Sequence, residues 1–456
     1  MKNQKEERFS RGPIFGTMIA MGVPTFVASM VNLLYNIVDR IFIGHIENYG
    51  AEALTGVGVT FPVIMVVTAF SNLVGAGGAP IAGIALGRGN RARSEQILGN
   101  GFAMLLTISV ILTVVFQIIK KPFLYMFGAS ETTYAYGEKY LTIYLCGTIF
   151  VMFSAGLNTF ITMQGAAVTA MFSVLIGAVM NLILDPVLIF GCRLGVRGAA
   201  LATVLSQASS AAWVLSYLIS KKAAVRLKKN KVKLEKEIVK QIASLGVSPF
   251  IMAVTESLIT VVLNSGAQKY GNDLYVGSIT ILQSVVQMIC TPMNGFANGV
   301  QSVISYNYGA GNRERVKKFC AALIGLSVVM TLSIASVCMM LPANIAGLFT
   351  ENEELISLCA GFMPIFIGGM GAFGLQCGSQ SCFMALGRVK ESFFFAILRK
   401  VILLTPLAIL LPAVMNSVSG IYWAEPISDT VSGVLCGTVF LLTIRKVLGR
   451  SERKPG

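Results

Sequence analysis

Twelve long apolar runs divide the chain, and they constrain its fold more than any other feature of the sequence. A helix needs about 20 mostly apolar residues to cross a bilayer. The runs lie at about 14–45, 52–80, 96–119, 136–162, 167–191, 197–220, 240–267, 275–305, 319–341, 355–384, 392–413 and 419–444. A transmembrane β-barrel would need alternating segments of about ten residues, but these runs are continuous. We therefore predict an all-α integral membrane protein with twelve transmembrane helices.

The small number of charges excludes several classes of protein. Asp, Glu, Lys and Arg make up 12% of the 456 residues, whereas soluble globular chains carry about 25%. Lipid must cover so apolar a core, which excludes a soluble enzyme, a nucleic-acid-binding domain and a disordered chain. The single histidine, His45, and nine cysteines without a C-x-x-C pair offer little for metal or triad chemistry. We expect no enzyme activity and no cofactor.

The basic residues predict the orientation, because Lys and Arg gather on the cytoplasmic side of membrane proteins. With the N-terminus inside, the outer segments hold only Arg40, Lys120, Lys121, Lys139, Arg193, Arg197 and Lys269. The inner segments hold the rest of the 36 basic residues, among them Arg399 and Lys400. This asymmetry explains the net charge of +15 without a nucleic-acid partner. We predict a multi-pass protein of the inner (plasma) membrane with both termini cytoplasmic, in which the first run is a spanning helix and not a removed signal peptide.

An internal repeat divides the runs into two sets of six. ALGRGNRAR begins at Ala85 and NYGAGNRER at Asn307, an offset of 222 residues that also relates Gly165 to Gly387. Six spans return the chain to the same side, so the halves are parallel repeats about an axis along the membrane normal. We predict an N-terminal six-helix bundle at 1–220, a basic cytoplasmic linker at 221–239 and a C-terminal six-helix bundle at 240–456. The two pseudo-symmetric bundles should surround a central cleft.

Prolines interrupt many of these runs, at positions 24, 62, 80, 186, 249, 292, 364, 406 and 426. Proline removes a helical hydrogen bond and kinks a helix. We expect several kinked helices, each with two possible shapes.

Ionisable groups inside spanning segments are costly and are candidates for function. Asp39, Asp185 and Thr203 each lie about six residues from the outer end of a run, and therefore about 9–10 Å deep at about 1.5 Å per residue. Tyr35 and Asn181 lie one turn before Asp39 and Asp185 on the same helix faces.

Two neighbouring carboxylates in a low dielectric cannot both stay ionised without a cation, so the site would hold either a proton or a sodium ion. The alternatives are that each aspartate satisfies unwound backbone, or that Asp39 pairs with Arg40. At offset 222, Asp39 and Asp185 correspond to Val261 and Leu407, while Glu425 and Asp429 correspond to Thr203 and Gln207. The predicted ion site is therefore confined to the first half.

Glu256 is the only ionisable residue in the middle of the seventh run. It could attract a cationic substrate or carry a proton, or it could be hydrogen-bonded inside the second half. Gln283 and Gln287 lie one turn apart on the eighth run and could line a cavity with Asn294 and Asn298, or join helices. Glu256, Gln283 and Gln287 are the predicted substrate-binding residues.

The chain resembles the multidrug and toxic compound extrusion (MATE) family. The resemblance rests on P-x14-D from Pro24 to Asp39, the ALGRGN and NYGAGN segments, Gln164-Gly165, NLILDPVLIF, GVRGAALATVLSQ and AEPISD. It implies two six-helix bundles around a V-shaped cleft and export of organic cations or amphipathic drugs in exchange for H⁺ or Na⁺. It also implies a coupling-ion site at Asp39, Asp185, Asn181, Thr203, Tyr35 and Asn158. The tenth run departs from members with a second-half ion site, because it carries no acid.

We interpret the chain as a secondary active multidrug exporter that works by alternating access, as a monomer in the lipid bilayer. The alternative is a flippase for a lipid-linked oligosaccharide or a related amphiphile. Such a flippase should carry intramembrane basic residues for a pyrophosphate, whereas the cleft-depth charges of this sequence are expected to be acidic. A membrane-embedded enzyme would need a metal or nucleophile cluster, and a passive channel would show no coupling to an ion gradient.

Overall fold

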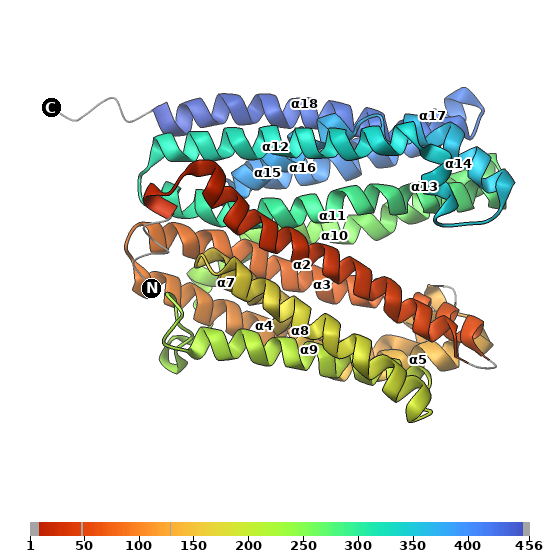
Figure 1. The fold of residues 1–456 in the computed structure, drawn as a ribbon, viewed down its shortest axis with the longest axis horizontal. Helices are drawn as coiled ribbons and strands as arrows, with labels where there is room; N and C mark the ends of the chain where they lie inside the picture. The colour runs from red at the N-terminus through yellow and green to blue at the C-terminus, as the bar shows by residue number, and fades with distance from the viewer. Residues whose placement is uncertain (1–8, 47–48, 128, 450–456) are drawn as a thin grey trace.

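The computed structural model describes residues 9–46, 49–127 and 129–449, which are mostly helical and contain no strands in those ranges. Figure 1 shows the long helices running side by side. The first half consists of α2 (Ile14–Gly44), α3 (Gly50–Gly87), α4 (Arg91–Met126), α5 (Glu131–Cys146), α6 (Thr148–Gly156), α7 (Asn158–Met163), α8 (Ala167–Pro186), η1 (Val187–Gly191) and α9 (Val196–Ile219). After the short η2 (Lys229–Lys231), the second half consists of α10 (Lys236–Tyr270), α11 (Asp273–Gly309), α12 (Arg313–Met340), α13 (Pro342–Gly347), α14 (Glu353–Phe366), α15 (Met370–Ala385), α16 (Val389–Ile397), η3 (Leu398–Leu404), α17 (Thr405–Met415) and α18 (Ser419–Gly449).

The structure confirms the predicted twelve-helix architecture. Ten helices of the described chain are long and apolar enough to span a membrane, and two further spans are bent pairs. The fourth span bends by 59° between α5 and α6, and the tenth by 54° between α14 and α15. The first six spans, red to yellow-green in Figure 1, form one bundle, and the last six, green to blue, form the other.

Glycines, and not the predicted prolines alone, mark the two bent spans. The breaks lie at Gly147 and at Gly368–Gly369, and Gly147 and Gly369 are related by the offset of 222. A Cβ on Gly147 would lie 2.4 Å from Val204, and one on Gly369 would lie 2.8 Å from Pro426. Each break therefore lets a neighbouring helix of the same bundle approach the backbone, whereas α2 and α3 continue through their prolines.

The structure also confirms the repeat. Gly89 and Gly311 end the inner turns with φ of +75° and +76°, and the related pair Gly165 and Gly387 has φ of +77° and +68°. The bundles meet where α2 lies against α11 and α3 against α10, which are symmetry-related pairs of helices. Both described ends of the chain lie at the same end of the molecule (Figure 1).

At the inner end, the two bundles touch through backbone. A Cβ on Gly87 would lie 2.0 Å from the carbonyl oxygen of Tyr306, and a Cβ on Gly309 would lie 2.1 Å from that of Ile84. Ile84 and Tyr306 are themselves related by the offset of 222, so the contact is reciprocal. No side chain fits between the bundles here, and we call these four residues the inner seal.

The linker between the bundles is fastened to the first one. The Gln164 side chain accepts a hydrogen bond from the backbone N–H of Val225 (2.8 Å), and the Asn100 side chain accepts one from that of Glu235 (2.6 Å). Lys228 forms an ion pair with Glu95 at 2.6 Å. The exact division into units at residues 220 and 240 stays a prediction.

Two basic residues were assigned wrongly from the sequence. Arg399 and Lys400 lie in η3, inside the span Val389–Met415, with 5% and 6% of their side chains exposed. They do not belong to the inner surface, because buried carboxylates of the second bundle hold them inside the span.

Candidate functional site

An acid pair lies inside the first bundle. Asp39 of α2 and Asp185 of α8 interact directly through their carboxyl groups, and Asp185 is fully buried. Asn181, one turn before Asp185, donates a hydrogen bond to its Oδ1 at 3.2 Å. One buried oxygen of each aspartate, Asp39 Oδ1 and Asp185 Oδ2, has no hydrogen-bond partner among the described residues. Burying such oxygens is costly, and a proton or a cation bound between them would lower that cost.

Tyr35 lies beside this pair, and Tyr140 connects Thr203 to the same polar layer. The Tyr35 hydroxyl neighbours Asp39 and accepts a hydrogen bond from Gln207 at 3.4 Å. Ser154 donates to Gln207 at 2.6 Å. Thr203 donates to the backbone of its own helix at 3.0 Å and contacts the hydroxyl of Tyr140.

Sequence reasoning missed Gln207 as a member of this layer. A signal was present, because Gln207 lies one turn after Thr203 on the same face of α9.

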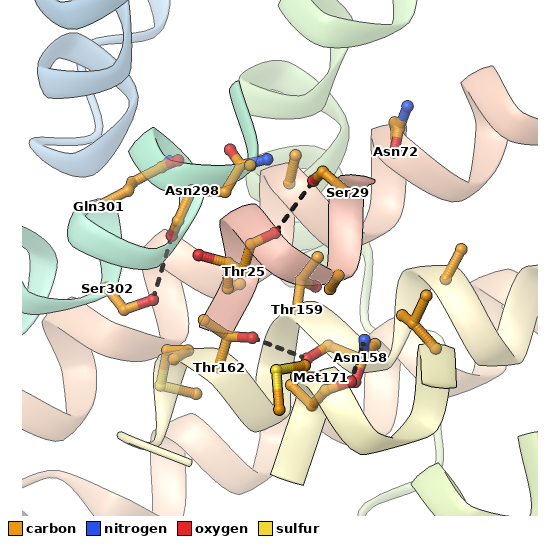
Figure 2. Close-up of a pocket in the computed structure, with 18 of the residues that line it drawn as sticks. Thr25, Ser29, Asn72, Asn158, Thr159, Thr162, Met171, Asn298, Gln301 and Ser302 are labelled. Carbon is orange, nitrogen blue, oxygen red and sulfur yellow. Dashed lines mark hydrogen bonds between the residues drawn. The ribbon is translucent and has the colours of Figure 1, made fainter. Parts of the chain in front are cut away.

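Asn158, also predicted for the ion site, makes no hydrogen bond to either aspartate among the described residues. Its Nδ2 donates to the Ala170 carbonyl at 3.1 Å, and its Oδ1 has no described partner. It lines a separate cavity of about 340 Å³ between the bundles. Figure 2 shows Asn158 on the wall opposite Asn298 and Gln301.

This cavity, here called the uncharged cavity, is polar without carrying a charge. It receives residues from α2, α3, α6, α7, α8 and α11, and therefore from both bundles. Its polar lining consists of Thr25, Ser29, Asn32, Asn72, Asn158, Thr159, Thr162, Thr291, Asn298, Gln301, Ser302 and Ser305. Several of the hydroxyls, such as that of Ser29, donate to their own helix backbone (Figure 2). Their oxygens, with the unpaired Nε2 of Gln301, leave hydrogen-bonding capacity for a ligand.

The three predicted substrate residues lie outside the uncharged cavity. Gln283 and Gln287 lie on α11 nearer to its outer end than Thr291 and Asn298, which do line the cavity. Glu256 lies on α10 with 60% of its side chain exposed. The structure therefore does not bring Glu256, Gln283 and Gln287 together in this cavity.

Glu256 belongs instead to a charge network in the second bundle. Lys400 Nζ lies 3.1 Å from Glu256 Oε2 and 3.9 Å from Glu425 Oε1. Arg399 binds Asp429 at 2.5 Å and Glu425 at 3.0 Å, and its guanidinium lies 4.4 Å from the ring centre of Phe373. The alternative that Glu256 is bonded inside the second half agrees with this arrangement. Its partner is Lys400, and the interaction is an ion pair.

A local widening of the eleventh span presents both cations to this network. Residues Leu398–Leu404 form a π-helical segment, a geometry that leaves backbone carbonyls in need of donors. Ser428 donates to the carbonyl of Arg399 at 2.7 Å, and Thr405 donates to that of Lys400 at 2.9 Å. These hydroxyls stabilise the wide turn, so Arg399 and Lys400 can reach carboxylates on α10 and α18.

The network corrects the expectation that charges at this depth are acidic only. Arg399 and Lys400 were the missed residues, and the sequence did carry a signal, since both lie inside the apolar run at 392–413. At offset 222 they correspond to Gly177 and Ala178 in the first bundle, which carry no charge. The first bundle has a pair of acids without a basic partner at these positions, and the second bundle has acids with two.

Comparisons with known proteins agree with the resemblance noted in the sequence. A family model described as MatE matches residues 24–187 and 249–410. The chain is 25% identical over 453 residues to the "Multidrug export protein MepA" of Staphylococcus aureus (strain NCTC 8325 / PS 47), which covers 99% of each chain. Among solved structures, it matches MATE in the bent conformation (TM-score 0.91, 21% identity, 98% of this chain and 99% of that chain) and in the straight conformation (TM-score 0.90, 21% identity, 96% and 98%).

Proposed function

Because the chain belongs to the MatE family, we propose that it is a secondary active multidrug exporter of the inner (plasma) membrane. It exports organic cations or amphipathic drugs in exchange for H⁺ or Na⁺, by alternating access, with both termini in the cytoplasm. The name of the Staphylococcus aureus relative, a multidrug export protein aligned over 99% of both chains, supports the export of several drugs.

The observation that carries this proposal is the acid pair. Two unit charges of like sign at about 4 Å repel by about 4 kcal/mol at an effective dielectric constant of 20. Asp39 and Asp185 therefore hold one proton or one sodium ion between them, and the cation leaves when the site opens to a side where it is scarce. An exchangeable cation at this depth is what coupling to an ion gradient requires.

The uncharged cavity supplies a route for the drug between the bundles. Its volume of about 340 Å³ lies within the range of small-molecule pockets. Met163 and Met171 on its wall have flexible side chains that adapt to different apolar ligands. Its hydroxyl and amide groups would bind the polar groups of a drug, while a cationic group would be attracted to the acidic residues elsewhere.

Alternating access would require the inner seal to separate. The backbone contacts of Gly87 and Gly309 hold the bundles together at the inner end. Rigid-body rocking of two such bundles about a central site is a known plan for transporters built from repeats. The bent spans at Gly147 and Gly369 would let one part of each bundle move relative to the other.

The flippase is the weaker alternative. Basic residues do lie inside the second bundle, but Arg399 is held by Asp429 and Glu425, and Lys400 by Glu256. A pyrophosphate would have to compete with carboxylates already within ion-pair distance. These residues therefore do not favour binding of an anionic lipid.

The experiment that tests the proposal is transport by the full chain reconstituted in liposomes. Movement of a fluorescent organic cation is followed under an imposed proton gradient, an imposed sodium gradient, both, or neither. We expect uphill transport with at least one gradient, and none in liposomes that contain the Asp39→Asn/Asp185→Asn double variant. Equal rates with and without gradients would instead identify a passive channel, and uptake of a lipid-linked pyrophosphate in place of the cation would identify a flippase.

A further inference from the structure

The charge network of the second bundle contains an unequal number of acids and bases. Glu256, Glu425 and Asp429 supply three negative charges when ionised, and Arg399 and Lys400 supply two positive ones. Arg399 is fully occupied, because it contacts Asp429 and Glu425 together and lies against Phe373. Lys400 is therefore the cation that two carboxylates share.

The two carboxylate partners of Lys400 differ in how far the surrounding helices cover them. Glu256 has 60% of its side chain exposed, whereas Glu425 has 5%. The ammonium group lies 3.1 Å from the exposed carboxylate and 3.9 Å from the buried one. A small movement of a flexible lysine side chain would exchange one partner for the other.

We propose that Lys400 is a tethered competitor for cations at Glu256, a role that rests on the proposed export of organic cations and on the prediction from the sequence that Glu256 binds them. A substrate cation approaches the exposed side of Glu256 and displaces the ammonium of Lys400, which then moves to Glu425. Lys400 never leaves the buried side of the network, so it returns to Glu256 when the substrate departs. It sets specificity by weakening the binding of cations and leaving uncharged ligands unaffected.

Two features of the fold favour this role over a permanent ion pair. The wide turn of η3 positions Lys400 between α10 and α18, with Thr405 holding its carbonyl. Glu425 is within reach of both cations, so the displaced ammonium does not become a buried charge without a partner. Such a charge would be strongly unfavourable, and the exchange avoids it.

Equilibrium binding tests the proposal without any gradient. Tetraphenylphosphonium, a monovalent cation without hydrogen-bonding groups, is titrated into the purified full chain, and triphenylphosphine oxide serves as an uncharged ligand of similar shape. We expect Lys400→Met to tighten tetraphenylphosphonium binding about tenfold and to leave triphenylphosphine oxide unchanged. Lys400→Arg, which keeps a cation at this position, should bind both ligands as the wild type does.

A second variant tests whether the effect of Lys400→Met comes from a changed fold or a changed net charge. Lys400→Met/Glu425→Gln removes the competitor together with the buried one of its two carboxylate partners, and the network keeps its net charge. It should also tighten tetraphenylphosphonium binding, and tightening in this variant cannot come from a general change in net charge. If Lys400→Met and Lys400→Met/Glu425→Gln both bind the cation no better than wild type while Glu256→Gln weakens binding, Lys400 is only a structural partner and the proposal is wrong.

The premise is tested separately by Glu256→Gln alone. If this change leaves tetraphenylphosphonium affinity unaltered, Glu256 does not bind substrate cations, and the inference falls with its premise. Neither result depends on gradient-driven transport, which tests the acid pair of the first bundle.

Discussion

The two bundles share a backbone plan but treat buried charge in opposite ways. The first places Asp39 and Asp185 together, and one oxygen of each has no hydrogen-bond partner in the described part of the chain. The second surrounds Glu425 and Asp429 with Arg399 and Lys400. Where the second bundle has its two cations, the first has Gly177 and Ala178.

The two bundles show how one repeat can be specialised without changing its frame. A carboxylate pair that forms no ion pair with a described basic residue takes its cation from solution, whereas a network with tethered cations does not. On the proposed function, the first bundle exchanges ions with the medium and the second keeps a fixed set of its own. Removal of one buried charge should therefore affect coupling in the first bundle and stability in the second.

Loss of an aspartate in the first bundle should abolish coupling, the strongest change that we predict. Asp39→Asn or Asp185→Asn should reduce gradient-driven export to the background of empty liposomes, because one carboxylate no longer competes with its neighbour for a cation. The unfolding temperature should not fall, since the change removes buried charge. Glu353→Gln, at an exposed carboxylate in the first turn of α14, is the matched control and should transport normally. Normal export by both aspartate variants would show that the acid pair does not couple transport to an ion, and the proposed difference between the bundles would then be wrong.

In the second bundle we expect a loss of stability. Arg399→Met leaves Asp429 and Glu425 without their closest cation, and breaking a buried pair in this way costs about 3–5 kcal/mol. The midpoint of thermal unfolding in detergent should fall clearly. Arg445→Met, at an exposed position near the end of α18, should leave it unchanged. An unaltered midpoint for Arg399→Met would mean that the network contributes little to the fold.

The inner seal offers a test of what the two bundles do together. In Gly309→Ala the added Cβ would meet the carbonyl of Ile84, and such overpacking costs about 1–3 kcal/mol. The bundles should separate at the inner end more often, by about tenfold for each 1.4 kcal/mol. Labelling of a cysteine placed at Ser305 in a cysteine-free background, with an impermeant reagent added from the inner side, measures this. Gly325→Ala, where the added Cβ meets nothing within 4 Å, should not change the labelling.

The smallest effect should come from the uncharged cavity. Gln301→Leu removes a donor that has no described partner, so the affinity of a drug that accepts a hydrogen bond should fall by about 1 kcal/mol, or roughly fivefold. Tetraphenylphosphonium, which accepts none, should bind as before. Equal losses for both ligands, measured by titration, would show that Gln301 does not act by donating a hydrogen bond, and no loss for either ligand would place the drug elsewhere.

The sequence predicted the parts that depend on regular spacing. Twelve runs, one offset and helical depth were enough to place Asp39 beside Asp185, and the offset also predicted the matching turns at Gly89 and Gly311. These predictions succeed because a helix has a fixed rise per residue and the repeat has a fixed offset, so positions in the sequence determine positions in the fold.

The parts that depend on packing could not be predicted in the same way. Arg399 and Lys400 were assigned to the inner surface because a rule for loops was applied to residues whose partners lie on other helices. The break at Gly147 depends on how closely Val204 approaches, and Asn158 faces a cavity that no single helix defines. Each is decided by neighbours distant in sequence.

The fastening of the linker has a consequence for the order in which the protein is made. Val225, Lys228 and Glu235 find the partners described above on the first bundle, at Gln164, Glu95 and Asn100. The ribosome completes that bundle and its linker before most of the second bundle has emerged, an interval of roughly 10–45 s for the remaining residues at about 5–20 residues per second. The first bundle can therefore close its inner face while it waits, and the second is inserted beside a neighbour that is already assembled.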